Sequence, residues 1–262
     1  MLKSSARRWF PLILLGLWGC GEHRDTLKVA ATAIPHAELL EQVQPQLESQ
    51  GIHLEIVYVE DYNMPNRALA EGQIKANFFQ HLPFLEAQLE EFRYPLVNMG
   101  AIEIEPMGIY SKAIKSLGDL PDGSTVAIPS DPSNEGRALL LLQQAGLLRL
   151  RDPSKLLSTP LDIAENSKHL RFVEVDAAML PRSLSDVSFA VINTNYALQA
   201  GLHPTQDALL LESAESPYVN ILVVRQGDEQ DPQLKALYQA LTSSSTRAFL
   251  QEHYRGAVLP AF

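Results

Sequence analysis

The chain has 262 residues, and because a typical domain holds about 150, this length allows one large domain or two modest lobes with a sizeable core. A composition of 46% hydrophobic and 20% charged residues is typical of a globular protein and excludes disordered, collagen-like and coiled-coil chains. The formal net charge of −10, with no basic patch after residue 20, argues against nucleic acid as a partner. The single cysteine, Cys20, excludes an internal disulfide framework and a cysteine-based zinc site.

Residues 1–19 have the features of an export signal. A basic start is followed by about ten uncharged residues and the small residue Gly19, and this apolar part is too short to span a bilayer permanently. Cys20 comes next, as in a bacterial lipobox, where the thiol is diacylated; the alternative is an incidental small apolar residue. We therefore expect a lipoprotein-type signal peptide over 1–19, lipidation at Cys20 and a lipidated tether over 20–26. Cleavage leaves 18 Lys and Arg against 31 Asp and Glu, so anchoring to the membrane would depend on acyl chains and not on charge.

The chain after the tether begins with strands that alternate with helices. An apolar run over 27–31 predicts a buried strand, and apolar residues at helical spacing then predict a helix that ends at Gly51. Pro45 should kink or shorten this helix, because it lacks an N–H and clashes with the preceding turn. We expect further strands over 52–58, 74–79 and 96–102, with helices over 65–70 and 82–92. Strands separated by helices predict a parallel or mixed sheet covered on both faces.

The same pattern restarts after residue 120. It predicts strands over 125–128, 189–192 and 218–224, a helix over 132–145 that ends at Gly146, and a final helical region over 234–253 interrupted at 242–246. Residues 147–176 show a mixed pattern, in which we expect only loops and short helices. Residues 68–78 and 183–192 share a weakly similar pattern of a short helix, a tight turn and a strand. This similarity is consistent with two α/β lobes that place ligand-binding groups at strand ends, although any α/β chain offers similarities of this kind.

The segment 131–137 is the first candidate for ligand binding. It follows a strand and opens a helix, with Asp131 or Ser133 as the N-cap. The backbone N–H groups and the dipole of such a helix start suit a small anion such as a carboxylate, and Arg137 adds a bidentate fork. The alternative is that Arg137 lies on the solvated helix face and pairs with a surface acid.

An aromatic cluster at a strand-to-helix junction is the second candidate. Residues 77–84 include three phenylalanines and His81, which together could surround an apolar or thioether side chain. At least one of Phe78 and Phe79 must pack in the core, because these two side chains alternate across the strand.

Asparagines at strand ends are the third candidate. Asn193 and Asn195 follow the strand over 189–192, and Asn220 opens the strand near 218–224. An asparagine offers both a donor and an acceptor, so these residues suit the ammonium or carboxylate of a ligand, or else they cap turns. The sequence shows no HxH or HExxH spacing, nucleophile elbow, phosphate loop or dinucleotide fingerprint, so we expect no catalytic residue, no metal and no cofactor.

Seven short motifs occur along the chain in a fixed order. They are PHAE at 35–38, DY at 61–62, FQH at 79–81, MGIYS at 107–111, DPSNEGR at 131–137, VINT at 191–194 and SPYVN at 216–220. Together they resemble the motifs of the methionine-binding lipoprotein family of bacterial ABC importers, the NlpA-type substrate-binding proteins. The resemblance runs from about residue 27 to the C-terminus.

This resemblance implies an α/β type II periplasmic-binding-protein fold, in which two lobes joined by two crossovers close on a free amino acid. Residues 27–108 and 219–262 would form lobe 1, and residues 109–218 would form lobe 2. By matching motif, Arg137 would hold the α-carboxylate, and Asn193 and Asn220 the α-amino and carboxylate groups. Asn134 would lie near the backbone end of the ligand. The residues implied to line the pocket for the methionine side chain are Tyr62, Phe79, His81 and Phe84.

The implied function is capture of methionine by a lipid-anchored monomer in the cell envelope, facing the periplasm or the cell exterior. It would deliver methionine to a membrane permease driven by a cytoplasmic ATPase, and it would not be an enzyme. One alternative is a lipoprotein of the same fold that binds a methionine-containing dipeptide or another apolar amino acid, because an aromatic pocket separates side chains that differ by a methylene by only about 1 to 3 kcal/mol. Another alternative is a surface adhesin or structural lipoprotein with a vestigial cleft.

Overall fold

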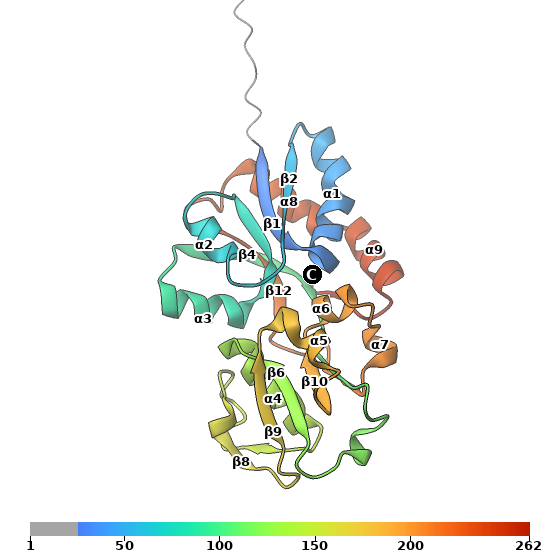
Figure 1. The fold of residues 1–262 in the computed structure, drawn as a ribbon. Helices are drawn as coiled ribbons and strands as arrows, with labels where there is room; N and C mark the ends of the chain where they lie inside the picture. Colours follow the sequence, from blue (N-terminus) through green and yellow to red (C-terminus); the bar gives the residue numbers. More distant parts are fainter. Residues whose placement is uncertain (1–25) are drawn as a thin grey trace, which may run out of the picture.

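A computed structural model describes residues 26–262, and in it the chain builds two sheets, each with its own covering helices (Figure 1). The predicted signal peptide over 1–19, the predicted lipidation site Cys20 and the tether up to residue 25 lie outside the described residues.

The first sheet has six strands in the order β13-β4-β12-β3-β1-β2. Strand β1 pairs in parallel with β2 and β3, whereas β12 pairs antiparallel with β3 and β4. The late strand β12 therefore lies in the middle of a sheet made mostly from the N-terminal part of the chain. The strands are β1 (Leu27–Thr32), β2 (Leu54–Val59), β3 (Ala76–His81), β4 (Leu96–Ile104), β12 (Val219–Arg225) and β13 (Leu259–Pro260).

Helices cover both faces of this sheet, because successive apolar side chains point to opposite faces. Val29 and Leu222 pack with α1, α8 and α9, whereas their neighbours Ala30 and Ile221 pack with α2 and α3. Burial of each side chain of leucine size contributes about 1.5 to 3 kcal/mol. The helices are α1 (Glu38–Ser49), α2 (Pro65–Ala70), α3 (Leu82–Phe92), α8 (Pro232–Leu241) and α9 (Ser244–Tyr254).

The second sheet has five strands in the order β11-β5-β10-β6-β9. Strands β10, β6 and β9 are parallel, and β5 is antiparallel to β10. One face packs against α4 (Pro132–Gln144), and the other packs against α5 (Leu180–Ser183) and α6 (Thr194–Gln199). The strands are β5 (Gly108–Tyr110), β6 (Thr125–Pro129), β9 (Arg171–Val175), β10 (Phe189–Ile192) and β11 (Leu210–Leu211). The remaining strands are β7 (Arg149–Leu150) and β8 (Ile163–Glu165), and the remaining α-helix is α7 (Pro204–Asp207).

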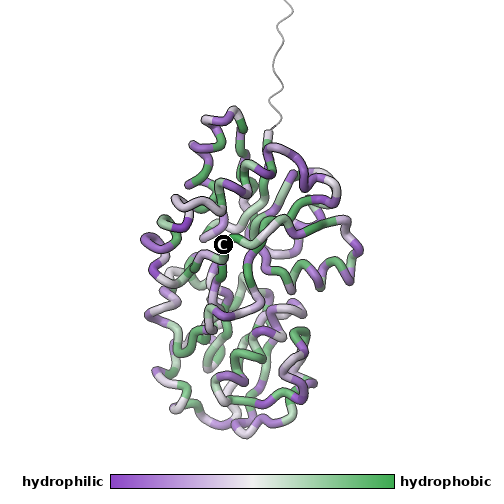
Figure 2. Tube along the Cα trace, turned by 180° about the vertical axis from the view of Figure 1, so that it is seen from behind, coloured by the Kyte–Doolittle hydropathy of each residue, from purple (hydrophilic) through white to green (hydrophobic). Residues whose placement is uncertain are grey.

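The described chain thus has the mixed α/β architecture that the sequence predicts, and it crosses between the two sheets twice. It leaves the first sheet between Ile104 and Gly108 and returns between Leu211 and Val219. This division supports the proposed assignment of 27–108 and 219–262 to one lobe and of 109–218 to the other. In Figure 2 the helices alternate between hydrophobic and hydrophilic segments, as expected when one face of each helix is buried. No helix within residues 26–262 has the length and apolar character needed to cross a membrane.

The prediction of only loops and short helices over 147–176 is wrong, and the shortening expected at Pro45 does not occur. Helix α1 continues through Pro45 to Ser49, so the proline does not shorten it; Leu40, Val43 and Leu47 bury one face of the helix on the sheet, and this packing outweighs the missing hydrogen bond. Residues 147–176 contain three strands and not only loops and short helices. Strand β9 was missed because it pairs only with β6 at the edge of the sheet and buries little of its surface.

A close backbone contact at the start of α4 gives a prediction about stability. A Cβ atom at Gly136 would lie 1.9 Å from the carbonyl oxygen of Leu156, so Gly136→Ala must displace backbone. We expect it to lower the free energy of unfolding by about 1 to 3 kcal/mol, measured by urea denaturation. Gly118→Ala is the control, because its Cβ meets only the Ser116 hydroxyl at 3.5 Å. Equal stability of the two variants would contradict this account of the packing.

Candidate functional site

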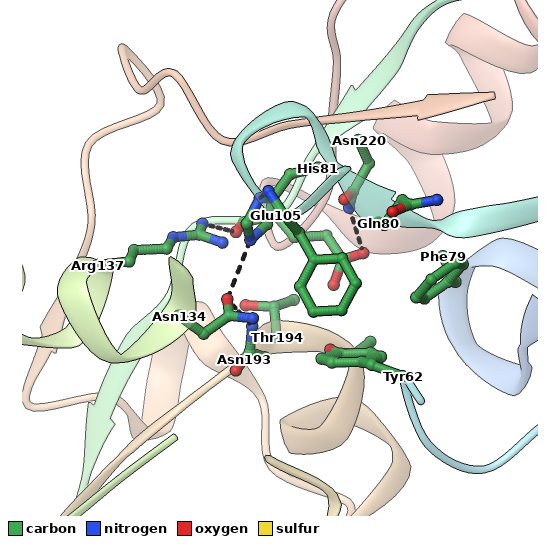
Figure 3. A pocket seen from close by; sticks show the side chains of 12 residues that line it. Tyr62, Phe79, Gln80, His81, Glu105, Asn134, Arg137, Asn193, Thr194 and Asn220 are labelled. Atoms are coloured by element: carbon green, nitrogen blue, oxygen red, sulfur yellow. Dashed lines mark hydrogen bonds between the residues drawn. The ribbon is translucent and has the colours of Figure 1, made fainter. Parts of the chain in front are cut away.

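A pocket of about 320 Å³ lies between the two sheets (Figure 3). The pocket receives side chains from the end of β3, the start of β12, the segment after β4 and the first turns of α3, α4 and α6. Its lining brings together all eight residues that the resemblance implies. The lining residues are Tyr62, Phe79, Gln80, His81, Phe84, Glu105, Asn134, Arg137, Asn193, Thr194, Asn195 and Asn220.

Arg137 is buried at one end of the pocket, with only 3% of its surface exposed. Its Nη2 donates to the Glu212 carboxylate at 2.5 Å and to the Glu105 carbonyl oxygen at 2.7 Å, and its Nε donates to Glu212 at 3.2 Å. Among the described residues, Nη1 has no hydrogen-bond partner, so it remains available to a ligand. The Tyr218 ring lies 4.5 Å from the guanidinium carbon. Burial lowers the pKa of Arg137, but the charge and hydrogen bonds of Glu212 outweigh burial and raise it, so the residue stays cationic.

A hydrogen-bonded bridge joins the two lobes at the middle of the pocket. His81 Nε2 lies 3.0 Å from Asn134 Oδ1, which also accepts from Asn193 Nδ2 at 2.8 Å. Asn134 Nδ2 in turn donates to the Asp131 carboxylate at 2.9 and 3.0 Å. Nδ1 of His81 accepts from the backbone N–H of Phe84, so Nε2 carries the proton. Burial, followed by the positive charge of Arg137, lowers the pKa of His81 to about 3, so this histidine is neutral.

An aromatic wall forms the other end of the pocket. The rings of Phe79 and Phe84 lie 5.8 and 5.7 Å from the Tyr62 ring, and the Tyr62 hydroxyl donates to Asn195 Oδ1 across the cleft at 2.7 Å. Burial raises the pKa of Tyr62 well above its usual value, so the hydroxyl keeps its proton. Phe78 points to the opposite face of β3 and packs in the core, which settles which phenylalanine of the pair reaches the pocket.

Two buried carboxyl groups lie together at the pocket, where Glu105 belongs to the lining and Glu103 does not. Asn220 Nδ2 donates to Oε1 of Glu103 at 2.7 Å and to Oε1 of Glu105 at 2.8 Å, and His36 Nε2 lies 3.3 and 3.2 Å from the same two oxygens. Burial raises the pKa of Glu103 to about 8, and burial with the neighbouring Glu103 raises the pKa of Glu105 to about 8. These three ionisable residues have ligand atoms within 4.8 Å of one another. The Asn220 amide already donates to both carboxyl groups, so we do not assign them as metal ligands.

The backbone N–H groups at the start of α4, which were expected to suit a ligand carboxylate, face a carboxylate of the protein itself. Asp131 is the N-cap, and its carboxylate accepts from the backbone N–H of Asn134 at 3.0 Å, while Ser133 donates its hydroxyl to the same carboxylate. A protein carboxylate therefore takes the position expected for a ligand anion. Asn193 precedes α6 but makes no side-chain cap, because its amide donates to Asn134 instead.

Sequence reasoning missed the acids around the pocket. Glu103 and Glu105 sit two residues apart in the run Ile102 to Glu105, so they share one face of β4 and its extension, and this spacing was the available signal. Glu212 gave no signal, because it lies in the connection after β11 and meets Arg137 only through the fold.

The arrangement suits a small molecule with a carboxylate and an apolar side chain. Nη1 of Arg137 can donate to the carboxylate, and the wall of Tyr62, Phe79 and Phe84 can cover the apolar part.

Comparisons with known proteins agree with this geometry. The sequence model of the NlpA lipoprotein family matches residues 27–262. The D-methionine-binding lipoprotein MetQ of Escherichia coli (strain K12) is 42% identical over 94% of this chain and 93% of that protein. The methionine-binding lipoprotein MetQ of Bacillus subtilis (strain 168) is 40% identical over 92% of this chain and 90% of that protein.

Solved structures show the same fold. A nutrient-binding protein from Burkholderia cenocepacia bound to methionine is similar with a TM-score of 0.88 and 45% identity, over 90% of this chain and 100% of that chain. A periplasmic substrate-binding protein of an ABC transporter from Coxiella burnetii is similar with a TM-score of 0.86 and 47% identity, over 90% and 100%. The predicted fold class is confirmed by these likenesses.

The pairing of Arg137 with Glu212 gives a second prediction. Glu212→Gln removes the negative partner of a buried cation, so we expect the free energy of unfolding to fall by on the order of 3 kcal/mol, measured by urea denaturation. Glu165→Gln is the matched control, since Glu165 pairs with Arg149 at the exposed surface and should contribute at most about 1 kcal/mol. A loss no larger for Glu212→Gln than for the control would show that Glu212 does not hold Arg137.

Proposed function

Because the chain belongs to the NlpA lipoprotein family, we propose that it is the substrate-binding component of an ABC importer and captures methionine in the cell envelope. It delivers the amino acid to a membrane permease driven by a cytoplasmic ATPase, and it acts as a monomeric carrier and not as an enzyme. The names of the relatives and the methionine-bound neighbour support this proposal. The observation that carries it is a pocket between the two sheets with a buried arginine at one end and an aromatic wall at the other.

The pocket chemistry matches the two ends of methionine. The α-carboxylate binds at Nη1 of Arg137, which is the part of the guanidinium that the protein leaves unused. The side chain lies along Tyr62, Phe79, His81 and Phe84, where contacts between sulfur and aromatic rings add about 0.3 to 1.5 kcal/mol. Asn134 and Asn193 lie close to the ligand's polar end.

Ligand binding favours the closed arrangement of the lobes. The contacts of His81 with Asn134 and of Tyr62 with Asn195 already link the two lobes across the cleft. A ligand that touches both walls adds contacts that exist only when the lobes are closed, so it shifts the population toward the closed form. The closed body then docks on the permease.

A lipid anchor keeps this carrier at the membrane. We propose that acyl chains on Cys20 hold the protein on the outer face of the cell membrane, with 20–26 as the tether. The relatives from Escherichia coli and Bacillus subtilis carry the name lipoprotein. The first described strand begins at Leu27, so the tether leads directly into the first sheet.

Thermal unfolding of the purified protein tests the proposed ligand. After unfolding and refolding to remove bound ligand, methionine at 100 times its Kd should stabilise the protein by about 2.7 kcal/mol and raise its Tm visibly. The other common amino acids and methionine-containing dipeptides are the controls. A shift with a dipeptide but not with methionine would favour the dipeptide carrier, and no shift with any compound would favour the adhesin or structural lipoprotein.

Replacement of Arg137 tests the carboxylate site. Arg137→Ala leaves the ligand carboxylate buried without its partner, so we expect a loss of about 2 to 5 kcal/mol, or roughly 30-fold to several thousand-fold in methionine affinity, measured by calorimetric titration. The control is Arg149→Ala, because Arg149 is exposed and is not part of the pocket lining. Methionine binding by Arg137→Ala at nearly the parent affinity would show that the carboxylate lies elsewhere.

A further inference from the structure

One buried amide at the aromatic end of the pocket has no role in the contacts proposed so far. Asn195, near the start of α6, lines the pocket and is only 2% exposed, and its Nδ2 has no hydrogen-bond partner among residues 26–262. Building on the proposed function, we propose that this amide donates a hydrogen bond to the thioether sulfur of the ligand. Asn195 then makes the site select methionine over norleucine, the analogue that has a methylene in place of the sulfur.

The hydrogen bonds of Asn195 hold its amide at the aromatic wall. Its Oδ1 accepts from the Tyr62 hydroxyl at 2.7 Å, and its backbone N–H donates to the Glu105 carboxyl group. Because Nδ2 and Oδ1 are bonded to the same carbon, they lie only about 2.3 Å apart. Nδ2 is therefore close to the Tyr62 hydroxyl, at the end of the pocket proposed for the methionine side chain. Figure 3 shows Tyr62 and Phe79 on the opposite side of the pocket from Arg137.

The other asparagines of the lining use their amide N–H groups within the protein. Asn134, Asn193 and Asn220 each donate from Nδ2 to a side-chain oxygen of another residue. Among the lining side-chain amides in residues 26–262, only the Nδ2 of Asn195 has no partner. A buried donor without an acceptor costs free energy, and buried polar groups in native proteins are usually paired. The free donor therefore favours a ligand that carries an acceptor at this end.

A thioether supplies such an acceptor within an otherwise apolar side chain. Sulfur accepts hydrogen bonds weakly, whereas a methylene does not accept them. Contacts between sulfur and aromatic rings favour methionine in any aromatic pocket. A methylene packed against Asn195 Nδ2 would in addition leave this donor without water or an acceptor. A site with a buried polar group rejects a ligand that cannot pair with it, so Asn195 adds selectivity that the rings alone do not provide.

Calorimetric titration of the full chain in detergent with methionine and with norleucine tests the inference. We expect the parent protein to bind methionine at least about tenfold more tightly than norleucine. Equal affinities for the two amino acids overturn the inference but leave the capture of methionine intact. Binding of neither amino acid overturns the proposed function as well.

Two variants assign the selectivity to Asn195. Asn195→Leu replaces the amide with an apolar side chain of similar size, and it also removes the acceptor of the Tyr62 hydroxyl. Both affinities should therefore fall, but the ratio of methionine affinity to norleucine affinity should fall by at least about fivefold. Asn193→Leu is the matched control, because Asn193 donates to Asn134 at the polar end, where the two ligands are identical. It should weaken both ligands and keep the ratio. A ratio that survives in Asn195→Leu, or that falls equally in Asn193→Leu, overturns the assignment.

A crystal structure of the methionine complex provides a test that needs no variant. We expect the ligand sulfur within about 4 Å of Asn195 Nδ2. A sulfur that contacts only the aromatic rings, with Nδ2 donating to water or to another atom of the ligand, overturns the inference and leaves the proposed function intact.

Discussion

The buried guanidinium of Arg137 is the charge around which the pocket is organised. A cation with 3% exposure is stable only with partners, and both partners come from the connections between the two sheets. The Glu105 carbonyl lies where the chain leaves the first sheet, and Glu212 lies where it returns. Arg137 on α4 therefore ties the second lobe to both crossovers, which places the proposed cationic partner of the ligand's carboxylate where the chain passes between the two sheets.

A second constraint is that the contacts of His81 and Tyr62 across the cleft involve neutral groups. His81 is kept neutral by burial and by Arg137, so its Nε2 proton is always available to Asn134. The hydroxyl of Tyr62 likewise keeps its proton and donates to Asn195. Neutral hydrogen bonds of this kind contribute only about 0.5 to 1.5 kcal/mol each. These two hydrogen bonds therefore contribute little free energy to closure. The additional contacts of a ligand with charged ends can shift the equilibrium between the open and closed forms.

A third group of polar contacts joins Asn220 to the buried acids Glu103 and Glu105. Asn220 pairs with Glu103 across β12 and β4, and this register brings its amide onto both carboxyl groups. The orientation of the Asn220 amide, and therefore which of its atoms can contact a ligand, depends on Glu103 and Glu105.

The sequence by itself determined the alternation of strands and helices, the presence of the motifs and the candidate residues, because these depend on local periodicity and on residue chemistry. Only the tertiary structure decided that Phe79 and not Phe78 faces the pocket, that Asp131 caps α4, and that Asn193 donates to Asn134 and not to its own helix. Helix α1 and strand β9 show the same limit. Packing on the first sheet keeps α1 helical through Pro45, and pairing with β6 at the edge of the second sheet forms β9. Glu212 became visible only in the fold, because its partner Arg137 comes from a distant part of the chain and local patterns carry no information about such a contact. The spacing of Glu103 and Glu105 predicts that they share a face of the strand, but only the fold shows that both meet the Asn220 amide.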